Sequence, residues 1–120
     1  MKAALQNYLD SLNAADIEAI TGLFADDATV EDPVGTEVHR GKDAIVQFYR
    51  HAVGTGARFS LDAPIRASFS NAAAMAVSVR VVHMEKPTCV HVIEVVKFNG
   101  AGEFISMQVF FGKSDMELLE

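Results

Sequence analysis

The chain has 120 residues, of which half are hydrophobic and 22% are charged, so its size and composition predict one globular domain over residues 1–120. Its formal net charge is −6, and its ten Lys and Arg residues form no run, which argues against binding to nucleic acid or to an anionic membrane. No apolar segment is long enough for a membrane span or a signal peptide, so we expect a cytoplasmic protein that binds a small molecule.

The N-terminal quarter predicts two helices. An apolar stripe at helical spacing is formed by Leu5, Tyr8, Leu9 and Leu12. Residues 13–16 break this pattern, and Asp16 is expected to cap a second, short helix. The apolar side of that helix would be formed by Ile17, Ile20, Leu23 and Phe24. We expect it to end in an acidic turn at residues 25–27.

A short strand and a third helix follow. Residues 28–32 alternate in polarity, which indicates a strand that ends at Pro33 and Gly35. The Asp32–Pro33 bond can be cis or trans, and cis is the less common isomer. Gly41 precedes the third helix, which stops near residues 54–56. Its buried stripe is formed by Ile45, Phe48, Tyr49 and Ala52.

The second half of the chain has a period close to two, which predicts strands. We expect them at residues 58–69, 72–85, 88–98 and 103–111, separated by turns at 70–71, 85–88 and 99–102. Helices followed by strands with short turns predict an α+β fold, in which helices cover one face of an antiparallel sheet. Between the layers we expect a concave apolar pocket for a flat hydrophobic ligand.

Asp32 is a candidate base because it shares its strand face with Ala28 and Val30. If that face is buried, desolvation raises the pKa of the carboxyl group and makes it a stronger base. The alternative is that Asp32 only caps the turn before Pro33.

Glu94 is the charged residue on the more apolar face of a strongly β-forming segment, beside Val92, Val96 and Phe98. A buried carboxyl tends to stay protonated, and a protonated carboxyl can donate a hydrogen bond. The alternatives are an edge strand with Glu94 in water, or a register in which Glu94 is paired.

Tyr8 lies on the apolar stripe of the first helix, so its hydroxyl group needs a partner if it is buried. Tyr49, on the third helix, could donate a hydrogen bond to the Tyr8 oxygen and make Tyr8 a better donor. The alternative for Tyr8 is an ordinary core tyrosine.

No metal site or cofactor motif is predicted. The histidines lack metal-ligand spacing, and Cys89, the single cysteine, is expected to be a small buried residue. Nucleophile motifs, dinucleotide motifs and P-loops are missing from the sequence. Alternating residues of one predicted strand could line the pocket or belong to the core: Met75, Val77, Val79 and Val81.

Residues 24–35 closely resemble the segment of bacterial Δ5-3-ketosteroid isomerases that carries their catalytic base. The positions of Tyr8, Asn13 and Asp16 before it, and the segment 98–102 after it, match the spacing in that family. The resemblance covers nearly the whole chain. It implies a cone-shaped, nuclear-transport-factor-2-like (SnoaL-like) fold, with three N-terminal helices packed on a curved, mainly antiparallel sheet, and it implies a homodimer.

The resemblance also implies a reaction without a cofactor, the conversion of 3-oxo-Δ5-steroids to 3-oxo-Δ4-steroids. Asp32 matches the family's proton-shuttling aspartate, Tyr8 its oxyanion-binding tyrosine, and Glu94 its protonated aspartic acid. Tyr49 matches a supporting tyrosine. The matches to residues that contact the steroid are Val34, Met75, Val77 and Phe111.

Two positions depart from the family pattern. Glu94 has one methylene more than the usual aspartic acid, and Phe24 replaces a tyrosine of some relatives. Three other functions are open: a non-catalytic module that binds steroid-like lipophiles, another enzyme of this fold such as an epoxide hydrolase or polyketide cyclase, and a structural or interaction domain. The sequence has no Arg–Asp arrangement of the kind that positions water in epoxide hydrolysis.

Overall fold

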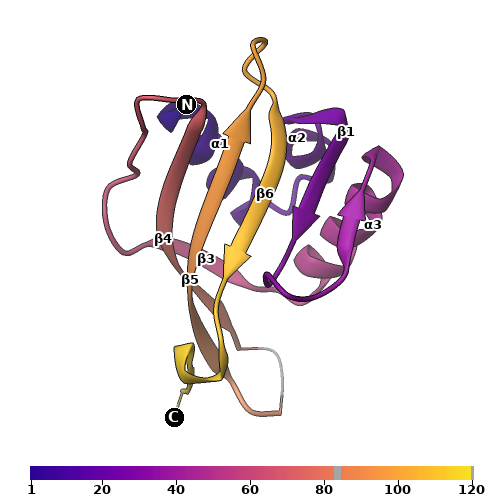
Figure 1. Ribbon diagram of the computed structural model, residues 1–120. Helices are drawn as coiled ribbons and strands as arrows, with labels where there is room; N and C mark the ends of the chain where they lie inside the picture. Colours follow the sequence, from indigo (N-terminus) through magenta and orange to yellow (C-terminus); the bar gives the residue numbers. More distant parts are fainter. Residues whose placement is uncertain (83–84, 120) are drawn as a thin grey trace.

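The computed structural model describes residues 1–82 and 85–119 and has an α+β architecture. A seven-stranded sheet carries the α-helices on one face (Figure 1). The strand order is β2-β1-β6-β5-β4-β3, with β7 paired to β5. The neighbouring pairs are antiparallel apart from β1 and β6, which are parallel, so the sheet is mixed. The described helices include none that is long and apolar enough to cross a membrane.

The first two helices form where the sequence predicts them. Helix α1 (Lys2–Asn13) buries the predicted stripe, and α2 (Ile17–Thr21) is capped by Asp16, whose Oδ1 accepts a hydrogen bond from the Ala19 amide at 3.1 Å. The expected continuation of α2 to Leu23 and Phe24 is wrong, because α2 ends at Thr21. Phe24 is buried as expected, but it begins a strand.

Strand β1 (Phe24–Glu31) includes the residues expected to form an acidic turn, so that expectation is also wrong. The parallel register with β6 shifts between Phe24 and Thr29, and the exposed residues Asp26 and Asp27 lie in this irregular part. Lys42 binds the backbone at the start of this irregular part: its Nζ donates hydrogen bonds to the carbonyl oxygens of Thr21 (2.8 Å) and Phe24 (2.7 Å). The local irregularity lets two exposed acidic residues lie within a strand whose other residues are buried or partly buried.

Strand β2 (Val38–Arg40) was not predicted, and with β1 it separates α2 from α3 (Lys42–Gly54). The three helices are therefore not one consecutive N-terminal block. Gly41 precedes α3 with φ +88°, a left-handed conformation that favours glycine, and its amide donates a hydrogen bond to the Ala28 carbonyl at 2.9 Å. This bond fixes the start of α3 against β1.

The remaining strands are β3 (Arg58–Leu61), β4 (Ala72–Val81), β5 (Thr88–Phe98) and β6 (Phe104–Phe110). β5 and β6 match their expected ranges closely. The first expected strand, 58–69, is too long, because β3 ends at Leu61 and only a single bridge joins Arg66 to Ala74. The second, 72–85, ends at Val81 in the structure, and its residues 83 and 84 lie outside the described residues.

The C-terminal segment adds two elements that were not predicted. A 3₁₀ helix, η1 (Lys113–Asp115), leads into β7 (Met116–Leu118). β7 extends the sheet beside the first residues of β5, beyond the part of β5 that pairs with β6.

The core lies between the helices and the inner face of the sheet. At its centre, aromatic rings pack edge to face, with Phe24 and Phe104 at 5.0 Å between ring centroids and Tyr8 and Tyr49 at 5.9 Å. Apolar burial of this kind is the main contribution to the stability of the fold. It also fixes the positions of the two tyrosines.

Candidate active site

A cavity of about 320 Å³ lies between the helices and the inner face of the sheet. Its lining is mostly apolar, with a few polar groups, as is typical of small-molecule sites. The polar lining residues are Tyr8, Asp32, Tyr49, Thr55 and Glu94. The apolar ones are Leu12, Phe48, Ala52, Ala57, Phe59, Val79, Val81, Val90, Val92, Val109 and Phe111.

Asp32 enters this cavity from the end of β1. Ala28 and Val30, on the same face, are fully buried, as the alternation predicts. The Asp32–Pro33 bond, whose isomer the sequence leaves open, is cis, the less common form. Burial raises the pKa of the Asp32 carboxyl to about 6, and the charge of nearby His39 acts in the opposite direction.

Glu94 projects from β5 into the same cavity, and its side chain is only 4% exposed. β5 lies between β4 and β6, so the edge-strand alternative is wrong. The residues on either side, Ile93 and Val95, face the other side of the sheet. Burial raises the pKa of Glu94 to about 8, and the negative charge of Asp32 adds to the effect. At neutral pH, Glu94 is therefore mainly protonated and Asp32 mainly ionised.

The structure brings Tyr8 and Tyr49 together. Their hydroxyl oxygens lie 2.7 Å apart in a buried hydrogen bond, and the Tyr49 hydroxyl group also lies 3.6 Å from Met107 Sδ. Burial raises the pKa of both phenols well above the usual value, and the charges of Glu94 and Asp32 act in the same direction. Both tyrosines are therefore neutral donors over the physiological pH range.

The residues expected to contact a ligand are divided between the cavity and other places. Phe111 lines the cavity. Met75 and Val77 share a face of β4 with Val79 and Val81, but they are 2% and 0% exposed and belong to the core. Val34 is 37% exposed and lines a second depression, which shares Phe111 with the cavity, rather than the cavity itself. Alternation identifies the inward face of β4, but it does not show where along that face the helices fill the space.

Sequence reasoning missed most of the apolar wall. Leu12, Phe48 and Ala52 were identified as buried helix positions, and Val90 and Val92 as strand positions, but none was assigned to the cavity. Residues of the core and residues of the cavity wall show the same apolar periodicity in the sequence. Only the packing of α1 and α3 over the sheet distinguishes the two.

The arrangement can perform acid–base chemistry on an apolar molecule. A carboxylate that accepts a proton shares one water-poor cavity with a neutral carboxyl and a phenol, which can donate hydrogen bonds to a developing negative charge. The described lining includes neither His nor Cys, so the metal-ligand types found there are the two carboxyls.

Comparisons with known proteins agree with this architecture. A family model described as a SnoaL-like domain matches residues 5–107. A protein of Nocardioides simplex called Steroid Delta-isomerase is 34% identical over 116 residues, which cover 97% of this chain and 93% of that protein.

Among solved structures, the epoxide hydrolase/cyclase-like enzyme SalBIII, described for its role in pyran ring formation in the polyether salinomycin, superimposes with a TM-score of 0.92. The match covers 98% of this chain and 95% of that one at 24% identity, which supports the fold alone. The family model and the identity to the steroid isomerase go further: the chain belongs to the SnoaL-like family and is a ketosteroid isomerase-like protein.

Proposed function

We propose that the protein is a cofactor-independent isomerase that converts 3-oxo-Δ5-steroids to 3-oxo-Δ4-steroids. The observation that carries the proposal is that two carboxyl groups, Asp32 and Glu94, line one apolar cavity, where burial raises the pKa of Glu94 further than that of Asp32. Such a pair supplies both a base and an acid at the same pH. The identity to the steroid isomerase of Nocardioides simplex supports the choice of substrate class.

In the proposed reaction, Asp32 is the base that moves one proton. It removes a proton from C4 of the steroid, the C–H electron pair forms a C3–C4 double bond, and the carbonyl electrons move to the C3 oxygen. When the carbonyl group re-forms, the C5–C6 double bond takes the proton back from Asp32 at C6. The remaining double bond lies between C4 and C5, and no atom is gained or lost.

Tyr8 and Glu94 are proposed to stabilise the negative charge on the C3 oxygen of the dienolate. Both can donate hydrogen bonds into the cavity, and donors fixed in a low-dielectric site stabilise a developing charge without reorganisation. Tyr49 would act through Tyr8: either oxygen of the pair can donate, and we propose that Tyr49 donates to the Tyr8 oxygen rather than to Met107 Sδ, which leaves the Tyr8 proton for the substrate. The carbonyl is thus proposed to lie between α1 and β5, with the apolar rings against Phe111 and the valines of β4 and β5.

The direct test is to mix the purified protein with a 3-oxo-Δ5-steroid and to follow the absorbance of the conjugated enone. We expect catalytic turnover, and turnover that is lost in Asp32→Asn. Steroid binding without turnover would instead support a non-catalytic lipophile-binding module. Hydrolysis or cyclisation of an epoxide without isomerisation would support a different enzyme of this fold.

We also propose a homodimer formed through the outer face of the sheet. Ile93 and Phe110 face each other across the β5–β6 ladder and are 47% and 43% exposed, and they lie beside Val34. Apolar side chains gathered on an open sheet face are typical of a symmetric interface. Analytical ultracentrifugation should show a dimer for the wild type and a monomer for Ile93→Lys.

The cytoplasmic location of the protein stays a prediction.

A further inference from the structure

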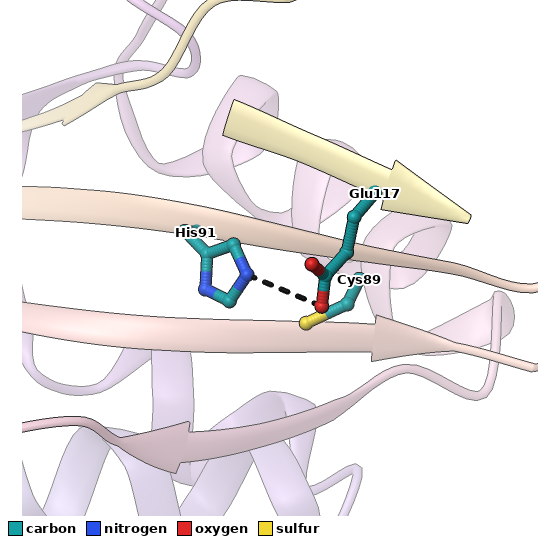
Figure 2. Close-up of side chains that lie close together, drawn as sticks. All are labelled: Cys89, His91 and Glu117. Atoms are coloured by element: carbon teal, nitrogen blue, oxygen red, sulfur yellow. Dashed lines mark ion pairs between the residues drawn. The ribbon is translucent and has the colours of Figure 1, made fainter. Parts of the chain in front are cut away.

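Three potential metal ligands meet on the outer face of the sheet, away from the cavity. Cys89 and His91 alternate along β5 with Val90 and Val92, which line the cavity, so the two pairs face opposite sides. Glu117 on β7 is the register partner of Cys89. Figure 2 shows the three side chains close together, and their ligand atoms all lie within 4.8 Å of one another.

Hydrogen bonds on the other side of His91 determine which ring nitrogen carries the proton. The Ser78 hydroxyl group lies 2.7 Å and 2.8 Å from the two carboxylate oxygens of Asp62, which can only accept, so the single Ser78 proton is donated there. His91 Nδ1 lies 3.1 Å from the same Ser78 oxygen. Nδ1 must therefore be the donor, and neutral His91 presents the lone pair of Nε2.

That lone pair faces an oxygen that also carries lone pairs. His91 Nε2 lies 3.6 Å from Glu117 Oε1 (dashed line in Figure 2). Two acceptors this close are stabilised by a positive species between them, either a proton or a cation. In a tetrahedral zinc site, nitrogen and oxygen ligands are about 3.4 Å apart, given bond lengths of about 2.0–2.2 Å. The observed distance is close to that value.

We propose that Cys89, His91 and Glu117 form a binding site for a divalent cation of the zinc class, with water as the fourth ligand. A thiolate, an imidazole and a carboxylate together favour zinc, cobalt or nickel over magnesium or calcium. Ser78 and Asp62 orient the imidazole, as the outer partners of metal-bound histidines do. All three ligands come from one chain, so the site needs no second copy.

Charge and access both fit this proposal. When the cation binds, the Cys89 thiol releases its proton to solvent, and the thiolate and Glu117 then balance the two positive charges. Asp62 adds a further negative charge near the site, since its Oδ2 lies 4.0 Å from His91 Nδ1. Arg80, the register partner of Cys89 on β4, carries a positive charge that disfavours a cation there. Cys89 is only 1% exposed, and His91, 48% exposed in the single chain, borders the proposed dimer face at Ile93. Access from solvent is therefore on the side of Glu117, whose side chain is 61% exposed and does not line that depression.

A cation at this place would fasten β7 to β5. The three residues of β7, Met116–Leu118, are all exposed, so little apolar burial holds this strand in the sheet. Glu117 would supply a ligand from β7, and Cys89 and His91 would supply two from β5. The site is the zinc-class arrangement that the sequence alone does not predict, because Glu117 is brought to Cys89 only by the strand pairing.

The test is a titration of the full chain with Co²⁺, followed by absorption spectroscopy. We expect a thiolate-to-cobalt charge-transfer band that saturates at one equivalent and is abolished in both Cys89→Ser and His91→Ala. His51→Ala, an exposed histidine on α3, is the matched control and should leave the band unchanged. If wild-type protein gives no such band, or if His91→Ala keeps it, the proposal is wrong and a proton joins His91 to Glu117 as a simple ion pair.

Two further measurements test the geometry. Ser78→Ala should weaken Co²⁺ binding by about 10–100-fold, as is typical when the outer partner of a metal-bound histidine is lost. Unchanged affinity would overturn the inference about the His91 proton. Zn²⁺ should raise the midpoint of thermal unfolding of the wild type but not of Glu117→Ala, whose exposed side chain is not needed for folding. Equal shifts in the two proteins would overturn the role of Glu117.

Discussion

The hydroxyl oxygens of Tyr8 and Tyr49 lie 2.7 Å apart in the core, although 41 positions separate the two residues in the chain. Tyr8 comes from α1 and Tyr49 from α3, and both line the cavity that holds Asp32 and Glu94. The direction of this hydrogen bond decides whether the Tyr8 proton is held by Tyr49 or is available to a ligand in the cavity.

The two tyrosines should differ in their effect on the rate. Tyr8→Phe removes a proposed donor and should lower kcat by about 10²–10³-fold. Tyr49→Phe leaves the Tyr8 hydroxyl group in place and should lower kcat by much less. Steady-state kinetics of both variants checks this, and equal losses would contradict the proposal that Tyr49 acts through Tyr8.

Asp32→Asn should reduce isomerisation by at least about 10²–10⁴-fold, because an amide cannot act as the base. Steroid binding, measured by equilibrium titration, should stay close to that of the wild type. The control is Asp27→Asn, an exposed carboxyl on β1, the strand that Asp32 follows, and it should leave turnover unchanged. Turnover like that of the wild type in Asp32→Asn would rule out this base.

Glu94→Ala should lower kcat by about 10²–10³-fold, because one of two proposed donors is lost. Glu94→Asp keeps the acid and shortens the side chain by one methylene, so it should retain more activity than Glu94→Ala. The comparison of kcat in these two variants separates the need for a carboxyl group from the need for its reach. An unchanged kcat in Glu94→Ala would show that Glu94 has no part in the reaction.

The pH dependence of kcat/KM should be bell-shaped. Activity should rise as Asp32 loses its proton near pH 6 and fall as Glu94 loses its proton near pH 8, since the base must be ionised and the donor neutral. Glu94→Gln keeps a neutral donor that cannot ionise, so its profile should lose the alkaline limb. An alkaline limb that persists in this variant would assign it to another group.

Stability should fall as the pH rises from about 5 to about 8. In the unfolded chain Glu94 loses its proton near its ordinary pKa of 4.5, whereas in the folded protein it keeps the proton until about pH 8. Within this window the unfolded state binds fewer protons, so the free energy of unfolding decreases with pH. Asp32 also lowers the free energy of unfolding as the pH rises from about 3.8 to about 6, because burial raises its pKa from 3.8 to about 6. Urea unfolding at pH 5 and pH 8 should show a smaller difference for Glu94→Gln than for the wild type.

The sequence predicts the inward direction of both acids because alternation in a strand is a local property. Ala28 and Val30 identify the face of Asp32, and Val92 and Val96 identify that of Glu94, and all four are buried. The helices are equally predictable, because each has an apolar stripe at helical spacing. The end of α2 is not predictable, because Phe24 is buried whether it ends a helix or begins a strand.

The parts that could not be predicted depend on distant pairing. β2 and β7 are three residues each and largely exposed, so they have no apolar pattern and form only beside β1 and β5. Met75 and Val77 illustrate the same limit within a face: their periodicity is that of Val79 and Val81, but the helices fill the space above them.

One strand, β5, serves both sides of the sheet: Glu94 on the inner side and His91 on the outer side. Consider one residue inserted in β5 before His91, with the pairing to β4 and β6 kept. Every later side chain of the strand would then change sides, so the His91 imidazole would point inward and the Glu94 carboxyl outward. During evolution, changes of chain length are thus tolerable in the loops that flank this strand but not inside it, whereas point substitutions on either side can accumulate independently.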